Sequence, residues 1–487
     1  MRRLGRPAPP EGPYLVVGLA RSGVAAAQAL RGRGELAIGV DAGEPPRDRL
    51  QALADAGIEV HLNESGLALC PRANALIKSP GVPRQAPVIE RALAEGKPVI
   101  GELELGWRLL GNEAIAVTGT NGKTTTVEWI GHIHRRGGLP VAVAGNVGRA
   151  LTGLVGRVDP EATIVCEASS FQLEDTVAFA PEAAVLLNIA PDHLDRHRTI
   201  EAYAAAKLKI FERQTSDDLA IVPAGLDLAI SGEARRVRFG GHGDGPFGGG
   251  GEAALFEREG TLWWRVGEDS AGALLAVGEL GLRGRHNVQN AMAAAAVCLA
   301  RGVDLDAVRE GLRTFRGVKH RLEEVARRDG VLYVNDSKAT NVASTLVALD
   351  AFKLSAGTGR GADIPARAGI PGRAGAPDRI VHLILGGQGK GQDFASLREP
   401  IETVCAAVYL IGEDAPLIAA ALTRAGAEPV GTGVPIRECG ELEHALEAAA
   451  EVAKPGDVVL LSPACASFDQ FEDYEERGER FRELVRR

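Results

Sequence analysis

The chain has 487 residues, more than one domain usually contains, so two to four domains are expected. Its hydrophobic fraction of 45% can fill buried cores, and its formal net charge of −9 argues against a general nucleic-acid surface. No apolar run reaches the roughly 18 residues of a membrane span, and the segment before Tyr14 lacks the apolar core of a secretory signal. The cysteines show no Cys-x-x-Cys pairing. Together these features favour a cytoplasmic protein.

The chain begins with a predicted βαβ arrangement. A strand at 14–17 leads into the turn Gly18–Gly23 and an alanine-rich helix, and a second strand, 36–40, ends at Asp41. This order is close to the dinucleotide pattern G-x-G-x-x-G followed by an acid about 20 residues later, but Ala20 replaces the middle glycine. A nucleotide-type diphosphate is therefore favoured over NAD, and a βαβ unit without a ligand is an equal alternative.

A third strand is predicted at 75–78, and the turn Ser79-Pro80-Gly81 follows it directly. Ligands of open α/β sheets bind at the carboxyl ends of strands, so this turn is a candidate binding segment. Residues 13–110 are predicted to form a small Rossmann-like domain.

The clearest motif is the glycine loop Gly119–Thr124 between a strand at 114–117 and a helix-like segment. Such a loop binds a nucleoside triphosphate, because backbone N–H groups and the helix N-terminus face the phosphates. Lys123 adds a positive charge, and the Thr124 hydroxyl suits Mg²⁺. Val117 stands where the usual pattern has its first glycine, so the loop is a variant, and a plain glycine turn is the weaker alternative.

Further polar residues follow the next predicted strands. Glu167 ends a strand at 162–166, where a carboxylate can meet the Mg²⁺ of the phosphate loop, although a solvated strand-end acid is the alternative. His193 and Asp195 lie in a polar loop and are candidate metal or phosphate contacts, but a surface histidine is the more common case. Lys207 lies on a predicted helix, where a lysine is usually solvated.

The remainder alternates strands with helices, which predicts mostly parallel sheets. Residues 240–251 read as a glycine-rich surface loop, and 353–378 as a flexible insertion without apolar periodicity. Polar loops follow strands at Asn335–Asn341, at Gly386–Lys390 and at Ser462–Asp469.

These motifs together resemble those of the Mur ligases, the ATP-dependent amide-forming enzymes of peptidoglycan precursor synthesis. The segments shared with the family in general are Gly119–Thr124, Glu167, Asn188–His193, Ala206-Lys207, Gly284–Asn290 and His320-Arg321. The segments that resemble the branch adding D-glutamate to UDP-N-acetylmuramoyl-L-alanine are Ser169–Leu173, Asn335–Asn341 and Ser462–Phe471.

The resemblance implies an α/β fold of three domains. The N-terminal Rossmann-like domain (13–110) would bind the UDP sugar, the central P-loop mononucleotide-binding domain (111–316) would bind ATP, and the C-terminal Rossmann-like domain (317–487) would bring the amino acid. The implied cofactors are ATP and Mg²⁺. The expected protein is a cytoplasmic monomer with no nucleic-acid partner and no membrane span.

The resemblance also assigns expected roles to single residues. Those expected at ATP are Gly119, Thr120, Asn121, Gly122, Lys123, Thr124, Thr125, Asn290, Arg321 and Asp336. Those expected at the UDP sugar are Gly18, Leu19, Ala20, Arg21, Ser22, Asp41, Ser79, Pro80, Gly81 and Asn146. Those expected at the amino acid are Lys338, Thr340, Lys390, Ser467 and Phe468. The expected metal ligands are Thr124, Glu167, His193 and a carbamylated Lys207, and the expected catalytic residues are Lys123, His193, Lys207 and Arg321.

One segment departs from the family, and several alternatives stay open. Some relatives carry Thr-Arg after the acid that matches Asp41, whereas this chain has Ala42-Gly43, so uridine contacts are expected from the backbone or from Arg21 or Ser22. The alternative functions are another amino-acid-adding Mur-type ligase, a folate polyglutamate ligase, a phosphate-loop ATPase or kinase, and an NAD-binding module. Ala20 argues against the last of these.

Overall fold

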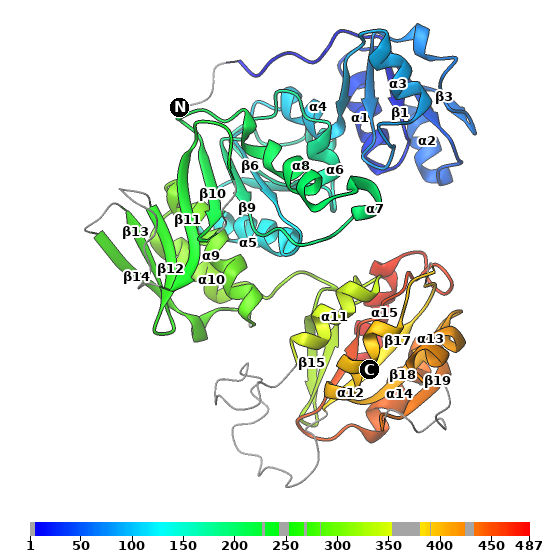
Figure 1. Ribbon diagram of the computed structural model, residues 1–487, viewed down its shortest axis with the longest axis vertical. Coiled ribbons are helices and arrows are strands. Elements are labelled where there is room, and N and C mark those ends of the chain that lie inside the picture. Colours follow the sequence, from blue (N-terminus) through cyan, green and yellow to red (C-terminus); the bar gives the residue numbers. More distant parts are fainter. Residues whose placement is uncertain are drawn as a thin grey trace. The chain divides into compact units, whose positions relative to one another are not determined.

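Figure 1 shows a computed structural model of the chain, which describes residues 5–225, 229–242, 253–266, 270–282, 284–352, 380–389, 391–423 and 433–487. The described strands form three sheets of five, nine and six strands, and most neighbouring strands are parallel. The predicted three-domain α/β fold is thereby confirmed. No helix in the described ranges is both long and apolar enough to cross a membrane.

The chain divides into two compact units. One comprises Met1–Gly281 with Arg285–Phe315, and the other comprises Leu282–Gly284 with Arg316–Arg487. The first unit holds the five-stranded and nine-stranded sheets, and the second holds the six-stranded sheet. The boundaries predicted from the sequence, at 110 and at 316, remain predictions.

The first sheet has the strand order β3-β2-β1-β4-β5, and all of its pairs are parallel. Its elements are β1 (Tyr14–Val17), α1 (Arg21–Gly32), β2 (Ala37–Asp41), α2 (Arg47–Asp55), β3 (Glu59–Leu62), β4 (Ala75–Lys78), α3 (Pro87–Ala94), β5 (Val99–Gly101) and α4 (Glu102–Leu109). Alternate strand residues face opposite sides, so Tyr14 packs with α1, α2 and α4, whereas Leu15 packs with α3. The chain adds β2 and β3 on one side of β1, and then adds β4 and β5 on the other side. The turns after β1 and β4 lie where this order reverses, which is a typical ligand position in such sheets.

The second sheet is built around β6, which pairs in parallel with β8 on one side and with β9 on the other. Its parallel part contains β6 (Ala114–Thr118), β7 (Val141–Gly145), β8 (Thr163–Glu167), β9 (Ala183–Leu186), β10 (Leu219–Pro223) and β11 (Arg235–His242). The helices of this region are α5 (Lys123–Arg136), α6 (Ser170–Glu174), α7 (Leu194–His197), α8 (Ile200–Glu212), α9 (Arg285–Ala300) and α10 (Leu305–Thr314). Because β6, β8 and β9 are parallel neighbours, the residues that follow them meet at one edge of the sheet.

Three more strands extend this sheet: β12 (Ala253–Arg258), β13 (Thr261–Val266) and β14 (Ser270–Ala276). β13 is antiparallel to both of its neighbours. The predicted loop at 240–251 is wrong for Gly240–His242, because these residues continue β11, whose backbone pairs with β12. Residues 243–252 lie outside the described ranges.

The third sheet has the order β15-β16-β20-β17-β18-β19, with β15 antiparallel at its edge. Its elements are β15 (Glu323–Arg328), β16 (Val331–Asn335), α11 (Val342–Asp350), β17 (Val381–Gly386), α12 (Arg398–Val404), β18 (Cys405–Ile411), α13 (Ala415–Leu422), β19 (Ile436–Gly440), α14 (Leu442–Val452), β20 (Val458–Leu461) and α15 (Tyr474–Arg486). Helices α11, α12 and α13 cover one face, and α14 and α15 cover the other. The predicted insertion 353–378 lies outside the described residues.

Candidate functional site

The glycine loop lies between β6 and α5, as predicted, and its last glycine begins the helix. Gly122 has φ of 85°, and a side chain there would collide with Oδ1 of Asn290 from α9. A glycine is therefore needed both for the backbone conformation and for the close approach of Asn290. The first N–H groups of α5 have no partner within the helix, so this end of the helix favours an anion.

The Lys123 side chain folds back over its own loop. Its Nζ donates to the carbonyl oxygens of Gly119 at 2.9 Å and of Thr120 at 2.8 Å. A phosphate bound at the loop would lie beside this ammonium group, as expected for a triphosphate loop.

Glu167 joins the loop to the neighbouring strand. Its carboxylate accepts from the Thr124 hydroxyl at 2.7 Å through Oε2 and from the Asn146 amide at 3.1 Å through Oε1. Gly145 allows β7 to approach closely, because a side chain at this position would collide with the backbone of Glu167. Glu167 is buried, so the carboxylate predicted from its place at the strand end lies directly beside the loop.

Lys207 is a buried residue of α8, whereas lysines on helices are usually solvated. Its Nζ donates to the Gly119 carbonyl at 2.7 Å and lies 4.6 Å from the centre of the Tyr203 ring. Burial, with a smaller effect of the nearby Lys123 charge, lowers the pKa of Lys207 to about 7. A large fraction of this amine is therefore neutral near neutral pH, which is the form that reacts with electrophiles such as CO₂.

Two residues outside the predicted site hold the loop in place. The Asn188 side chain accepts from the N–H groups of Thr120 and Asn121 and donates to the Asn121 carbonyl. The Tyr203 hydroxyl donates to Thr120 Oγ1 at 3.3 Å. Asn188 lies just beyond the end of β9, so the reasoning that selected Glu167 after β8 could also have selected Asn188.

His193 lies in the loop before α7, in a left-handed backbone conformation with φ of 50°. Its ring is 4.9 Å from the Phe171 ring and 6.4 Å from the Tyr203 ring, and its Nε2 is 3.5 Å from Asp192 Oδ2. His193 and Lys207 therefore both lie near Tyr203. The side chain of Asp195 is outside the described part of the structure.

The oxygen atoms near the loop fit a magnesium ion. Among the side chains that the structure describes, no group of three or more His, Cys, Asp or Glu residues is arranged to hold a metal ion. Mg²⁺ in nucleotide sites, however, takes only one or two protein oxygens and completes its shell with phosphate oxygens and water. Thr124 Oγ1 and Glu167 Oε2 supply this type of donor, next to the loop that would hold the phosphates.

Most residues predicted for the UDP sugar lie at the carboxyl ends of β1 and β4, whereas Asp41 ends β2 and Asn146 follows β7 of the second sheet. Asp41 accepts from the backbone N–H groups of Leu19 at 2.6 Å and Gly43 at 2.9 Å, so its carboxylate fixes the first turn. Ser79 Oγ donates to the Gly18 carbonyl at 2.8 Å and lies 3.4 Å from Ser22 Oγ. The two turns are therefore joined by direct contacts. The remaining predicted residues of these turns are Ala20, Arg21, Pro80 and Gly81.

In the second unit, Asp336 lies buried at the end of β16, immediately beside the His320-Arg321 segment. Its carboxylate accepts from the Ser462 hydroxyl at 2.8 Å and from the Leu322 N–H at 3.1 Å. Burial raises the pKa of Asp336 to about 7, although these hydrogen bonds and the Arg321 charge act in the opposite direction. The structure thus brings together Arg321 and Asp336, two residues predicted to contact ATP.

The described residues predicted for the amino acid occupy two loops of this unit, one after β16 and one after β20. Lys338 Nζ lies 5.5 Å from the centre of the Tyr474 ring, and the Thr340 N–H donates to the Lys338 carbonyl. Ser467 is buried, Phe468 is 63% exposed, and Lys390 lies outside the described residues.

The sequence reasoning missed Arg477, a fully buried residue of α15 that holds these two loops together. Its guanidinium donates to Ser337 Oγ and to the carbonyl oxygens of Ser337, Cys465 and Ala466. A charged helix at the end of a chain usually presents its arginines to solvent, so no local pattern indicates that this arginine is buried.

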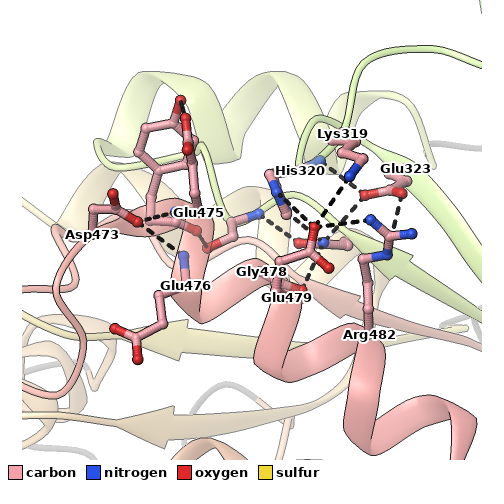
Figure 2. Close-up of polar contacts among 12 residues, drawn as sticks. Lys319, His320, Glu323, Asp473, Glu475, Glu476, Gly478, Glu479 and Arg482 are labelled. Carbon is pink, nitrogen blue, oxygen red and sulfur yellow. Dashed lines mark hydrogen bonds and ion pairs between the residues drawn. The ribbon is translucent and has the colours of Figure 1, made fainter. Parts of the chain in front are cut away.

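Figure 2 shows how α15 contacts the segment that carries Arg321. His320 is buried, Asn335 Nδ2 lies 3.0 Å from its Nδ1, and Glu479 lies 3.7 Å from its Nε2. Asn335 also donates to the carbonyl of Gly478, and a side chain at Gly478 would collide with the His320 ring. Burial lowers the pKa of His320, which favours the neutral ring that accepts from Asn335.

Comparison with protein families finds three consecutive matches. Residues 13–101 match the Mur ligase MurD-like N-terminal domain, residues 117–298 match the Mur ligase middle domain, and residues 367–465 match the Mur ligase glutamate ligase domain.

Similar curated proteins match over nearly the whole chain. UDP-N-acetylmuramoylalanine–D-glutamate ligase of Acidobacterium capsulatum is 41% identical over 97% of this chain and 95% of its own length. The protein of the same name from Koribacter versatilis is 39% identical over 97% of both chains.

Solved structures share the fold at lower identity. UDP-N-acetylmuramate-alanine ligase MurC from Thermotoga maritima has a TM-score of 0.56 and 19% identity, over 98% of this chain and 99% of its own. MurF ligase from Thermotoga maritima in complex with ADP has a TM-score of 0.50 and 17% identity, over 92% and 93%.

We predict that Gly478→Ala destabilises the protein by about 1–3 kcal/mol, because the new methyl group displaces the buried His320 ring. Gly32→Ala is the matched control, since nothing lies within 4 Å of a side chain placed there and alanine is favoured in a helix. Urea unfolding of the two variants and the wild type measures the difference. Equal stability of G478A and wild type would contradict the packing argument.

Asp336 predicts a specific pH dependence of stability. Its pKa is about 7 in the folded protein and about 4 in an unfolded chain, so its contribution to stability is lost as the pH rises from about 4 through 7. Asp336→Asn keeps the shape and stays neutral. Its unfolding free energy relative to wild type should therefore rise over this window, by up to about 1.4 kcal/mol per pH unit, and then level off. Denaturant titrations at several pH values test this, and a pH-independent difference would refute it.

Proposed function

The chain belongs to the Mur ligase family, and on that premise we propose that it joins D-glutamate to UDP-N-acetylmuramoyl-L-alanine with the use of ATP. The observation that carries the proposal is the 41% identity to a D-glutamate ligase over 97% of the chain. The match of residues 13–101 to a MurD-like N-terminal domain supports the same acceptor. The reaction belongs to peptidoglycan precursor synthesis and thus to cell-wall formation in growing and dividing cells.

ATP binding is supported by the geometry of the phosphate loop. Gly119–Thr125 would surround the phosphates with backbone N–H groups, and Lys123 would neutralise the β- and γ-phosphates. Asn290 lies against this loop and would contact the adenine. The family resemblance assigns the γ-phosphate contact to Arg321 and the ribose contact to Asp336.

Magnesium would be held through Thr124 and Glu167 and would neutralise charge on the transferred phosphoryl group. We propose that Lys207 carries a CO₂-derived carbamate and, with His193, belongs to a second cation site. The lowered pKa of the buried Lys207 amine supports this, because only the neutral amine forms a carbamate.

The chemistry must activate a carboxylate, which is a poor electrophile at neutral pH. One oxygen of the alanine carboxylate attacks the γ-phosphorus of ATP, and the bond to the β–γ bridging oxygen breaks to give an acyl phosphate and ADP. The D-glutamate amine then attacks the acyl carbon and loses a proton, and inorganic phosphate leaves. The chain's own residues supply positioning and positive charge, chiefly Lys123 and Arg321.

Binding of the two other substrates follows the predicted residue sets. The UDP sugar would lie on the turns Gly18–Ser22 and Ser79–Gly81, with Asp41 supporting the first turn and Asn146 beside Glu167. The two carboxylates of D-glutamate suit the ammonium and hydroxyl groups of the set Lys338, Thr340, Lys390, Ser467 and Phe468.

We also propose three domains with boundaries near residues 110 and 316, a monomeric state and a cytoplasmic location. The six free cysteines support a reducing compartment.

The direct test measures release of ADP and phosphate by the purified protein. ATP, Mg²⁺ and UDP-N-acetylmuramoyl-L-alanine together should give sustained turnover only when D-glutamate is added, and L-glutamate should fail. Turnover that ignores the amino acid would favour a simple ATPase. Turnover with lysine or diaminopimelate in place of D-glutamate would indicate another ligase of the family.

Lys207→Ala should lower kcat by about 100-fold or more, because a charge near the transferred phosphoryl group is lost. Added formate or acetate should restore part of the activity by replacing the carbamate. Glu201→Ala at the exposed start of the same helix is the control and should retain wild-type activity. Full activity of K207A, together with no added mass on Lys207 in the wild type, would exclude the carbamate.

A further inference from the structure

A buried ion pair connects the first sheet to the second. Lys78 is the last residue of β4, and Asp175 directly follows α6; their Nζ and Oδ2 atoms are 2.7 Å apart. The side chains are only 0% and 3% exposed. Burial lowers the pKa of Lys78 and raises the pKa of Asp175, so each group depends on the other to keep its charge. A buried pair of this kind is weak evidence for a purely stabilising role, since apolar residues of similar volume often stabilise as well.

Lys78 also fixes the turn that follows its own strand. Its Nζ donates to the Val82 carbonyl at 2.6 Å and to the Ser79 carbonyl at 3.3 Å. The ammonium group of Lys78 is therefore in contact with the Asp175 carboxylate and with two carbonyl oxygens of this turn. We call residues 79–82 the acceptor turn, because they include the segment assigned above to the UDP sugar.

A second contact reaches the acceptor turn from the central region. Arg196 of α7 donates to the Pro80 carbonyl at 2.8 Å and lies 3.4 Å from Glu174 Oε2. Its guanidinium stacks over the Phe171 ring at 4.2 Å, and this ring is also the neighbour of His193. The acceptor turn is therefore held by the same helices that lie beside the proposed metal-binding residues.

The partners of Lys78 and Arg196 lie on a short path of chain from the phosphate site. Glu167 ends β8, α6 begins three residues later at Ser170, and Asp175 follows the end of α6. The backbone of Asp175 also accepts from the Gly101 N–H at 3.3 Å, which adds a contact to β5. Asp175 thus connects the acceptor turn to the strand that carries the carboxylate beside Thr124.

We propose that Lys78 and Asp175 are positioning residues that fix the acceptor turn relative to Glu167, so that the carboxylate of the bound acceptor reaches the γ-phosphate of ATP. This inference rests on the proposed function and deepens it. Small errors of placement have large effects on such reactions, since the rate depends on the alignment of the attacking oxygen.

The experiment compares steady-state constants for all three substrates in Lys78→Met, in Lys78→Met/Asp175→Leu and in the wild type. K78M should raise KM for UDP-N-acetylmuramoyl-L-alanine by about tenfold or more and lower kcat, whereas KM for ATP and D-glutamate should stay within about twofold. The double variant should recover thermal stability, because no uncompensated charge is left buried. The KM of the double variant for UDP-N-acetylmuramoyl-L-alanine should stay raised, because the Ser79 and Val82 carbonyls still lack the donor that Lys78 provides.

Lys97→Met is the matched control. Lys97 is a partly buried lysine near the same sheet, and it forms an ion pair with Glu95. Its Nζ donates to the Cys70 carbonyl. Lys97 precedes β5, whereas the acceptor turn follows β4. The Lys97→Met variant should have the same KM as the wild type for all three substrates.

Two outcomes would overturn the inference. One is an acceptor KM within twofold of wild type in the double variant, which would make the pair purely structural. The other is an equal rise of all three KM values, which would indicate general damage to the fold. Wild-type turnover tests the proposed function itself, whereas the differences between variants test the pair, so the two failures are distinguishable.

Discussion

Two ammonium groups share one carbonyl oxygen in this protein, and the candidate phosphate site depends on that arrangement. Lys123 and Lys207 both donate to the oxygen of Gly119, at 2.9 and 2.7 Å. Like charges this close, one of them fully buried, repel each other in a medium that screens them poorly. Burial is the main cause of the low pKa of Lys207, and this repulsion lowers the pKa further. A second consequence of the repulsion is a strong preference for anions at the loop, which a polyphosphate or a carbamate satisfies.

Parallel strands explain how the loop acquires its other partners. β6 lies between β8 and β9, so Glu167 and Asn188 reach the loop from either side. Helix α8 then brings Lys207 and Tyr203 over it. Each of these side chains holds the backbone or a hydroxyl of the loop, which leaves the loop preorganised for its ligand.

The same principle extends to the acceptor turn and to the second unit. Lys78 and Arg196 fix backbone carbonyls of the acceptor turn, and Arg477 fixes the backbone of two loops that carry proposed amino-acid contacts. In each case a buried or partly buried cation orders a polar loop at a strand end. Such loops have little apolar surface to pack, so charge-assisted hydrogen bonds are the interaction available to order them.

The sequence by itself determined the local parts of this protein. It was sufficient for the α/β class, for strands such as 14–17 and 75–78, and for the phosphate loop, because periodicity and a contiguous motif depend only on neighbours along the chain. The roles expected of Lys207 and Arg321 came from resemblance to a family, since an isolated lysine or arginine has no local signature.

Only the tertiary structure decided which distant side chains support these parts. It buried Lys207, paired Lys78 with Asp175, and enclosed Arg477, which the sequence alone would leave in solvent. It also continued β11 to His242, which pairs with Glu257 of β12 beyond an irregularity at Gly240 and Gly241, where the positive φ angles suit glycine. These outcomes depend on burial and on partners far away in the chain, and burial is what sets both the pKa of a lysine and the need for a counter-charge.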